Sequence, residues 1–534
     1  MEPTRALAAL AVVLCFVVAS VAGPDPYQRP SNADCVELDT TAADADQVVL
    51  YPPEFILEGD ETETGEFYTQ VTSAIGFSVR YYPTYKLVSN NIDNETYVLY
   101  QCGSRAPELS AFPAGTKMFQ VPLTSISAPA TVPYAFVDFL GLGDRVHDVS
   151  PYVSSPCGQA LLECANSTAP DFSLLSNTTV RYATVGPYVD GMITSEPYPF
   201  SKAFTVSASL DPGPLNRAEW IKFVGLFFNL GKQASLIFDS IKAEYEQTRA
   251  AAAPAAGAKR PVVAWASHFK YEADESYQLS FDPYQGNLTE DAGGVMLDRE
   301  ALKAVKGVTG SPFDPSSTTL YYAWNVKGGF ASKEEAKAAF LAALKQADVV
   351  IDETYVVDPA PYDNAAARAE WGITEAEVAA VPALAANRVF REDGIISATG
   401  GLDWFEGAIA RPDKILKDLV RALSPEKTQG QGFTYLRNLA TEKPVVVTAD
   451  DCNAAEPCTA EPKVICPLVK VCGAGQTPAL LTSGTDGMCV YKECGGAAAA
   501  AGATPGNAAA AMAAPAIVLT VLVVAVVEVL LNFC

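Results

Sequence analysis

The feature that most constrains the fold is a pair of predicted helices in the middle of the chain, at residues 215–252. Asn216 followed by Glu219 predicts a capping box at the start of the first helix, and Gly231 predicts a left-handed stop at its end. The second helix carries apolar side chains at heptad spacing, which are Ala234, Phe238, Ile241 and Tyr245. Because strand and helix patterns flank the pair on both sides, we predict a helical strut between two α/β lobes.

The two ends of the chain predict a secreted protein that is held at a membrane. Residues 1–22 carry Arg5, an apolar run and a small-x-small site that ends at Ala22, which is typical of a signal peptide. A first transmembrane helix is the alternative, but the run is short for a span. Residues 515–534 form an apolar tail with no Lys or Arg after it, and residues 497–514 form an Ala- and Gly-rich stalk. This arrangement favours a GPI-anchor signal, with a C-terminal transmembrane helix as the alternative. The predicted location is the extracellular face of the plasma membrane.

Glycosylation sequons and cysteines agree with an oxidising compartment. The sequons are at Asn94, Asn166, Asn177 and Asn287. The cysteines between the two terminal segments are Cys35, Cys102, Cys157, Cys164, Cys452, Cys458, Cys466, Cys472, Cys489 and Cys494. We expect Cys157 to bridge Cys164 locally and Cys35 to bridge Cys102. The last six cysteines predict a disulfide-rich module at 443–496, because their spacing lacks the C-x2-C pattern of zinc sites.

The pattern of apolar residues divides the rest of the chain. We predict an N-terminal extension at 23–65, a first α/β lobe at 66–214, a second α/β lobe at 259–425 and a polar linker at 426–442. Predicted first-lobe strands lie at 77–88, 97–100, 117–126, 146–149 and 203–208, with a helix at 131–140 between the third and the fourth. Predicted second-lobe strands lie at 261–267, 319–324, 348–351 and 388–391, and its helices begin near residues 284, 332, 374 and 412. The expected fold class is therefore α/β, with two Rossmann-like lobes, a strut and a small C-terminal module.

Several kinds of chemistry are disfavoured by composition. The formal net charge of -25 disfavours nucleic acid as a partner, because like charges repel. The chain has 2 histidines, no G-x-S-x-G elbow and no P-loop pattern. Paired carboxyls such as Asp352 and Glu353 are commonplace in proteins and point to no reaction. We therefore predict that the protein is not an enzyme and carries no cofactor.

Aromatic side chains follow several predicted strands, at the carboxyl edges where open α/β sheets bind ligands. As a set they suit a large, flat ligand that is held by stacking and a few hydrogen bonds. The predicted ligand-binding residues are Tyr188, Trp265, His268, Tyr271, Tyr322, Trp324 and Trp404.

Four phrases of the chain are similar to one known family. They are VPYAFVDFLGLGDRVHDVS (132–150), AEWIKFVGLFFNLGKQASLIFDSIKAEY (218–245), EDAGGVML (290–297) and ADVVIDETY (347–355). They resemble bacterial periplasmic substrate-binding proteins with a helical strut between their lobes, the ferric-siderophore and cobalamin binders of ABC importers. The resemblance covers about residues 70–425 and implies a small ligand between the lobes. The family has no fixed ligand motif, so the aromatic residues match it only by their position in the strand order.

The chain departs from that family in its sequons, its cysteine module and its hydrophobic tail, which suggest a eukaryotic cell-surface glycoprotein. The leading hypothesis is a surface protein that captures an iron chelate in the interlobe cleft for uptake through a membrane partner. A structural or adhesive surface glycoprotein with the same fold is the alternative. An extracellular enzyme is the least supported hypothesis.

Overall fold

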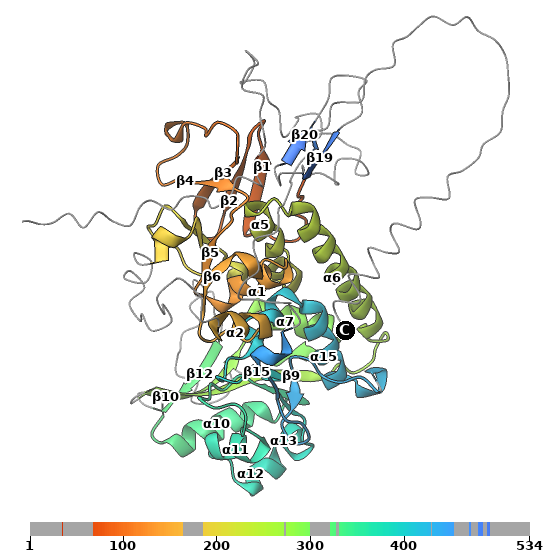
Figure 1. Ribbon diagram of the computed structural model, residues 1–534. Helices are drawn as coiled ribbons and strands as arrows, with labels where there is room; N and C mark the ends of the chain where they lie inside the picture. Colours follow the sequence, from red (N-terminus) through yellow and green to blue (C-terminus); the bar gives the residue numbers. More distant parts are fainter. Residues whose placement is uncertain are drawn as a thin grey trace, which may run out of the picture.

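The computed structural model describes residue 35 and residues 68–163, 185–271, 274–298, 321–326, 330–428 and 430–452, together with the short strands at 469–470, 479–483 and 489–491. Two α/β lobes lie one above the other, and the long helix α6 (Gly231–Ala252) runs along one side of both (Figure 1). Within the described residues, no helix is both long and apolar enough to cross a membrane. The predicted signal peptide, stalk and hydrophobic tail lie outside these residues.

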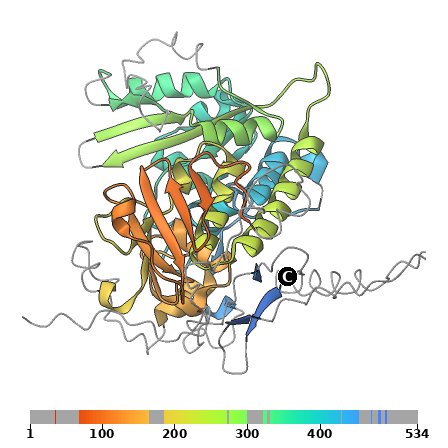
Figure 2. The same ribbon diagram turned by 90° about the horizontal axis from the view of Figure 1, so that it is seen from above.

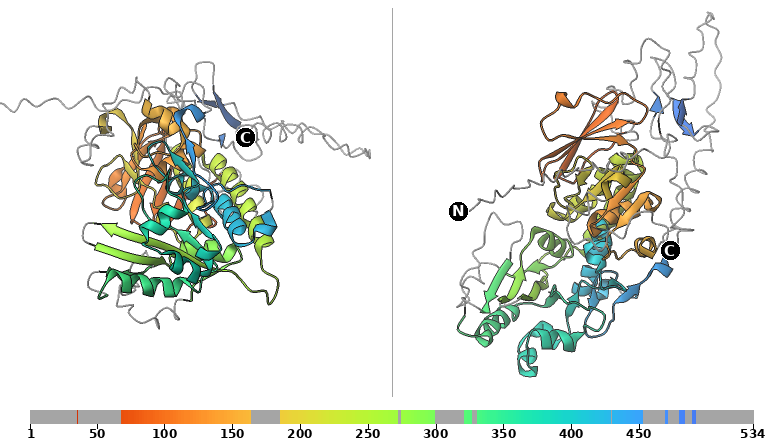
Figure 3. Two further views of the ribbon diagram at one scale, coloured as in Figure 1. Left: turned by 90° about the horizontal axis from the view of Figure 1, so that it is seen from below. Right: turned by 60° about the vertical axis from the view of Figure 1, so that its left-hand side comes forward.

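The first lobe contains two four-stranded sheets. The upper sheet has the order β1-β2-β3-β4 and the lower sheet has the order β6-β5-β7-β8 (Figures 1 and 3). The strands of the upper sheet are β1 (Phe77–Tyr81), β2 (Tyr85–Asn90), β3 (Glu95–Gln101) and β4 (Lys117–Val121). Those of the lower sheet are β5 (Ile126–Ala128), β6 (Val146–Val149), β7 (Gly191–Thr194) and β8 (Ala203–Thr205). All neighbours in the lower sheet are parallel.

Proline explains two differences from the predicted strands. The single strand expected at 77–88 is a hairpin, β1 and β2, whose turn contains Pro83. The strand expected at 117–126 is divided at Pro122 into β4 and β5, which belong to different sheets. Proline has no N–H to donate to a strand partner, so it ends a strand that the apolar pattern alone would continue.

Helices cover the lower sheet of the first lobe. They are α1 (Thr131–Phe139) and α2 (Pro156–Glu163), with the single turn η7 (Gly186–Tyr188) before β7. The short helices α4 (Pro214–Ala218) and α5 (Trp220–Phe227) follow β8 and the turn η8 (Ala208–Leu210). Trp220 is fully buried in this lobe, and its ring centroid lies 5.0 Å from that of Phe77. Aromatic side chains therefore form part of the core of this lobe.

The second lobe is built on one mixed sheet with the order β12-β10-β9-β13-β14-β16 and the short strand β11 beside β9. Its strands are β9 (Val262–Tyr271), β10 (Asp274–Ser280), β11 (Val295–Met296), β12 (Tyr321–Asn325), β13 (Val349–Asp352), β14 (Val389–Arg391) and β16 (Arg437–Asn438). β9, β11, β13 and β14 run parallel, whereas β10, β12 and β16 are antiparallel to their neighbours. The mixed α/β class is confirmed, but the sheet is not a simple repeat of strand and helix, because β10 turns back directly after β9.

Each face of this sheet is covered by its own helices. One face packs against α10 (Lys333–Leu344), α11 (Asn364–Glu370), α12 (Glu375–Ala380) and α13 (Pro382–Ala385), which lie below the sheet in Figure 1. The other face packs against α7 (Pro283–Asp291) and α15 (Pro412–Leu423). The helix starts predicted near residues 332 and 374 are confirmed, since Ser332 caps α10 and Thr374 caps α12. α15 begins at Pro412, as predicted.

Helix α6 is the strut. Ala234, Phe238 and Ile241 lie in the core of the first lobe, whereas Tyr245 and Ala252 lie in the core of the second lobe. The four residues at heptad spacing are all buried, as predicted. One rigid helix of 22 residues therefore contributes to both cores.

The predicted ends of the first strut helix were wrong. Asn216 caps nothing, because α4 already begins at Pro214. Glu219 instead accepts hydrogen bonds from the backbone N–H groups of Thr72, Ser73 and Ala74. Gly231 begins α6, and the left-handed residue before it is Asn229, with φ 58°. A side chain at Gly231 would meet Thr69, which explains the glycine by close packing.

The segment predicted as a polar linker at 426–442 belongs to the second lobe. Asp418 on α15 accepts hydrogen bonds from the backbone N–H groups of Thr434, Tyr435 and Leu436. Leu436 and Arg437 are buried, and β16 pairs with β14. The polar composition misled the prediction, because these polar groups are satisfied inside the lobe.

The cysteine pairing was predicted in part. The expected bridge between Cys35 and Cys102 is confirmed. The bridge between Cys157 and Cys164 is wrong, because Cys157 pairs with Cys452, 295 residues further along the chain. Cys452 therefore does not belong to a closed set of six cysteines. The pairing of the remaining cysteines is a prediction that falls outside the described residues. In the described part of this region, β18 (Val469–Lys470), β19 (Ala479–Ser483) and β20 (Cys489–Tyr491) form a small antiparallel sheet.

The Cys157–Cys452 disulfide fastens the two lobes together. Strand β17 (Val445–Val447) pairs with β15 (Ile395–Ser397) of the second lobe. The chain then passes to α2 of the first lobe, where Gln159 donates a hydrogen bond to the carbonyl of Val447. The disulfide follows five residues later, after the turn η11 (Ala449–Asp451). The lobes are thus joined by the strut and by a covalent link from residues 445–452.

Candidate functional site

Three loops meet where the lobes touch. They follow β6 in the first lobe and β13 and β15 in the second lobe. A Cβ atom on Gly401 would lie 2.3 Å from the carbonyl oxygen of Tyr152, and one on Gly400 would lie 3.4 Å from that of Val357. Thr131 donates a hydrogen bond to the carbonyl of Phe405 at 3.0 Å. We call this region the lobe junction.

The lobe junction exposes large apolar side chains. They are Tyr152 from the first lobe and Tyr355, Val357 and Phe405 from the second. We call these four side chains the apolar rim. Tyr152 is 68% exposed and Tyr355 is 83% exposed, although both follow buried strands. Single exposed apolar residues are normal on a protein surface, but a group from three loops at the carboxyl ends of strands is typical of a binding surface.

Beneath this rim, carboxyl groups of the second lobe hold the start of α2. Glu406 accepts hydrogen bonds from the backbone N–H groups of Ser154 and Ser155, and Asp403 accepts one from the Ser154 hydroxyl at 2.7 Å. Burial and the nearby Asp403 carboxyl raise the pKa of Glu406 to about 8. Every one of these contacts joins the two lobes, so this cluster fixes their relative position.

A second carboxyl pair lies at the carboxyl ends of the parallel strands β13 and β14. Asp352 is opposite Arg391 in the register of these strands, so Glu353 and Glu392, the next residues, are neighbours on the opposite face. Gln285 of α7 lies over this face and donates a hydrogen bond to Glu353 Oε1 at 2.8 Å. The Glu392 side chain is buried, with 5% exposure.

The two carboxyl groups disfavour each other's charge. Burial, Asp282 and Asp352 raise the pKa of Glu353 to about 7. Burial and the neighbouring Glu353 carboxyl raise the pKa of Glu392 well above its ordinary value. Glu392 Oε2 and Gln285 Oε1 are both buried, and neither has a hydrogen-bond partner. Buried polar atoms are normally paired, so this group is unusual.

A residue of the first lobe, Arg217, lies near the carboxyl pair Glu353 and Glu392. The guanidinium of Arg217 on α4 lies 3.7 Å from the ring centre of Tyr284 on α7, and its Nη2 lies 3.8 Å from Asp282 Oδ1. Tyr284 and Asp282 flank the start of α7, the helix that carries Gln285. The carboxyl pair is therefore close to the contact between α4 and the second lobe.

Four of the predicted ligand residues are core residues instead. Trp265 and Trp324 are fully buried, Trp404 is 7% exposed, and His268 is 2% exposed. Trp265 donates a hydrogen bond to Thr289 and packs against Trp404, with ring centroids 6.0 Å apart. The prediction placed these side chains by strand order alone. Alternation along β9 and β12 turns Trp265, His268 and Trp324 into the core, and Trp404 is buried from the turn η9 (Asp403–Phe405).

His268 has a structural role. Its ring nitrogens lie 3.0 Å from Glu370 and 2.9 Å from Glu275, and its ring stacks on Tyr277. Lys333 also contacts Glu275. The imidazole is thus held between two carboxylates in the lobe core, on the face opposite Glu353.

The remaining predicted ligand residues are not gathered at one place. Tyr188 is partly exposed in the first lobe, where its carbonyl accepts a hydrogen bond from Ser125. Tyr271 is exposed at the end of the β9–β10 hairpin. The backbone of Tyr322 pairs with Leu279 in the sheet. Their role in binding stays a prediction.

Of the predicted glycan acceptors, two lie in the described residues. Asn94 is exposed in the turn between β2 and β3, with φ 56°. Asn287 is exposed on α7, and its amide donates a hydrogen bond to the carbonyl of Pro212. Asn166 and Asn177 lie outside the described residues. Glycosylation stays a prediction at all four asparagines.

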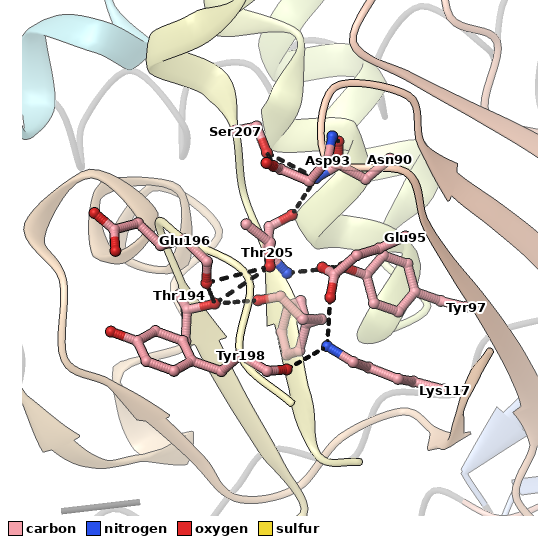
Figure 4. A network of polar contacts seen from close by, with 11 residues as sticks. Asn90, Asp93, Glu95, Tyr97, Lys117, Thr194, Glu196, Tyr198, Thr205 and Ser207 are labelled. Carbon is pink, nitrogen blue, oxygen red and sulfur yellow. Dashed lines mark hydrogen bonds and ion pairs between the residues drawn. The ribbon is translucent and has the colours of Figure 1, made fainter. Parts of the chain in front are cut away.

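Another polar network lies inside the first lobe, and Figure 4 shows how it connects the two sheets of this lobe. Lys117 bonds Glu95 at 2.5 Å and the carbonyl of Tyr198 at 3.0 Å. Tyr97 donates to Glu95 and accepts from the backbone N–H of Thr205. Since its charged groups are paired with each other, the network is best explained as a contact that fixes one sheet on the other.

No known family model matches this sequence, and no curated protein matches it either. Solved structures that are similar to the chain include bacterial substrate-binding proteins. A periplasmic haem-binding protein from Pseudomonas aeruginosa is 13% identical, with a TM-score of 0.38, over 60% of this chain and 99% of that chain. A possible iron-binding protein from Staphylococcus epidermidis is 13% identical, with a TM-score of 0.37, over 57% of this chain and 99% of that chain.

A third similar structure comes from an ABC-type Fe3+-hydroxamate transport system of Saccharomonospora viridis. It is 13% identical, with a TM-score of 0.32, over 51% of this chain and 86% of that chain. These proteins are of the kind that the four sequence phrases resemble.

Proposed function

We propose that this protein binds a small ligand at the lobe junction. The observation that supports this proposal is the exposed apolar group Tyr152, Tyr355, Val357 and Phe405, which both lobes contribute at the carboxyl ends of their strands. The strut and the Cys157–Cys452 disulfide hold these loops in place. A site that is formed before the ligand arrives loses little conformational freedom on binding, which favours affinity.

The ligand class that we propose is a chelate of iron. Support for it comes from the sequence phrases that resemble ferric-siderophore binders. Aromatic side chains such as Tyr152 and Tyr355 can stack on a flat or bulky complex. We also propose that the chain acts at the outer surface of a eukaryotic cell, held there by a GPI anchor or a C-terminal helix, and that it delivers its ligand to a membrane uptake partner.

A fluorescence titration of the purified full chain tests the proposal. Trp404 and Trp265 lie at and just below the junction, so a ligand bound there should change their emission. The probes are ferrioxamine B, ferric citrate, haem and cobalamin. We expect saturable quenching with at least one of them.

Two variants locate the response. Tyr152→Ala with Tyr355→Ala should weaken binding at least tenfold, because stacking area is lost. Leu236→Ala removes an exposed apolar side chain of α6 and should leave the affinity unchanged. If no probe quenches the emission, ligand capture is wrong and the structural or adhesive surface role becomes the better hypothesis.

A further inference from the structure

Two carboxyl groups and one amide group lie at the carboxyl ends of β13 and β14, below the lobe junction. Glu353 and Glu392 project from adjacent strands on one face, and the Gln285 side chain of α7 donates a hydrogen bond to Glu353. The only hydrogen bond that joins the three, among the described residues, is the one from Gln285 Nε2 to Glu353. Glu392 Oε2 and Gln285 Oε1 are left unpaired, although both are buried. The group therefore has acceptor capacity to spare.

No cation of the described residues neutralises this pair. Arg391 is the nearest one on the same strands, but it lies on the other face, where its Nε bonds Asp393 at 2.8 Å. Arg217 on α4 is engaged with Tyr284 and Asp282. Within the described part of the chain, neither Glu353 nor Glu392 forms an ion pair with Lys or Arg. A buried carboxyl beside a partly exposed one, neither of them in an ion pair, favours the arrival of a positive group.

We infer that Glu353, Glu392 and the Gln285 amide oxygen bind a protonated primary amine of the ligand. An ammonium group has three N–H donors and no acceptor, and these residues offer three oxygen atoms as partners. Hydrogen bonds between ionised partners are about twice as strong as neutral ones. This inference rests on the proposed ligand-binding function and adds to it the charge and the head group of the ligand.

A metal ion fits the same residues less well. Hard divalent cations take six or more oxygen ligands, of which several are carboxylates. Across the described residues, no three Asp, Glu, His or Cys side chains are grouped so that they could hold a metal ion. Two carboxyls and one amide match the donor number of an ammonium group better.

The position of the group allows a ligand to reach it. Glu392 is buried, but Glu353 and Gln285 are each partly exposed. Tyr355 follows Glu353 by two residues and belongs to the exposed apolar rim. A ligand with an apolar or aromatic body could therefore lie on the rim while its amine reaches the carboxyl pair. The formal net charge of -25 also favours the approach of a cation.

The test compares two ligands that differ only in the amine. Ferrioxamine B is a ferric hydroxamate with a free pendant amine, and its N-acetylated form is the matched control. Cadaverine serves as an amine without iron. Calorimetric titration of the full chain should show ferrioxamine B binding at least tenfold tighter than the acetylated form.

Variants assign the effect to the carboxyl pair. Glu353→Gln and Glu392→Gln should each abolish the preference for the free amine and leave binding of the acetylated form unchanged. The control is Glu375→Gln, which alters an exposed carboxylate on α12. Both variants should also raise the melting temperature of the ligand-free protein, because they remove a repulsion, and this readout shows that they fold.

The outcomes separate the two proposals. Equal affinity for both hydroxamates would overturn the amine site and leave ligand capture standing. Binding of cadaverine that is lost in both variants, without binding of either hydroxamate, would support the amine site and overturn the iron chelate. If none of the three binds and the fluorescence panel is also silent, both proposals fail.

Discussion

The two faces of strands β13 and β14 carry charged residues that differ in their pairing. On one face, Asp352, Arg391 and Asp393 are paired with one another, with Arg437 and with the Tyr362 hydroxyl. On the other face, Glu353 and Glu392 have no counter-charge among the described residues, and Glu392 Oε2 has no partner. The residues alternate along the same two strands, and Glu392 is buried as the paired residues are, whereas Glu353 is partly exposed. The difference teaches that pairing, and not burial, separates a structural charge from one that is available to a ligand.

The paired face should be the more sensitive to mutation. Arg437 donates to both carboxylate oxygens of Asp393, at 2.6 and 2.8 Å, and to the carbonyl of Tyr362. Arg437→Met should lower the free energy of unfolding by about 3 to 5 kcal/mol, because Asp393 loses its main partner. Urea denaturation measures this loss. Lys259→Met breaks the exposed pair with Asp348 and should cost less than about 1 kcal/mol. Equal losses in the two variants would contradict the comparison.

The shielding of Glu353 and Glu392 from water should depend on the Cys157–Cys452 disulfide between the lobes. Cys157→Ser with Cys452→Ser should lower the free energy of unfolding by about 2 to 4 kcal/mol, because the disulfide restrains the unfolded chain. The pH dependence of the free energy of unfolding that Glu353 and Glu392 cause should also become smaller, because lobes without the disulfide admit water to the junction.

Removal of the Cys35–Cys102 bridge is the matched control for that variant. This disulfide does not bridge the lobe junction, so its loss should reduce stability without changing the response of the carboxyl pair to pH. An equal decrease of this pH dependence in both variants would show that the junction does not shield Glu353 and Glu392 from water.

The pH dependence of stability should identify the unpaired face. Glu353, with its pKa raised to about 7, and Glu392, with its pKa raised well above its ordinary value, bind protons more tightly in the folded state than in the unfolded state. Their contribution to stability is therefore present below about pH 4.5 and is lost as the pH rises through about 7. Asp282, Asp352 and Asp393 add to the repulsion, whereas Arg391 opposes it.

The double variant Glu353→Gln with Glu392→Gln should remove this dependence. At pH 8 it should be more stable than the natural chain by on the order of 2 kcal/mol, and at pH 4.5 the two should be alike. Thermal unfolding across this pH range is the measurement. A variant that is less stable at pH 8 would mean that the pair already has a positive partner.

The smallest predicted effect compares one polar side chain from each face. Tyr362→Phe removes the hydrogen bond from the hydroxyl to Asp352, which is 3.0 Å long, and should cost about 1 to 2 kcal/mol. Gln285→Met removes one hydrogen bond and one unpaired oxygen together, so stability should change by less than about 0.5 kcal/mol. Chemical denaturation of the ligand-free protein checks both values. A larger loss for Gln285→Met would show that its amide is structural.

Local sequence patterns predicted much of the secondary structure. β6 begins and ends at the predicted residues, α15 begins at the predicted residue, and α12 begins beside Thr374, where its start was predicted. The hairpin strand β10 was missed, because residues 274–280 have neither a long apolar run nor strict alternation. The role of Glu353 was also missed, since a carboxyl beside a strand is common and its neighbour Glu392 is distant in the sequence.

The sequence by itself determined the strut, because the buried stripe of α6 depends only on the helical period of its own residues. It also determined that both lobes would combine strands and helices. Only the tertiary structure decided which side chains are buried in the core and which are exposed at the junction, as Trp265 and Tyr355 illustrate. It likewise decided that Cys157 would meet Cys452. The physical reason is that side-chain direction and long-range pairing depend on strand register and on the packing of distant segments, which no local pattern contains.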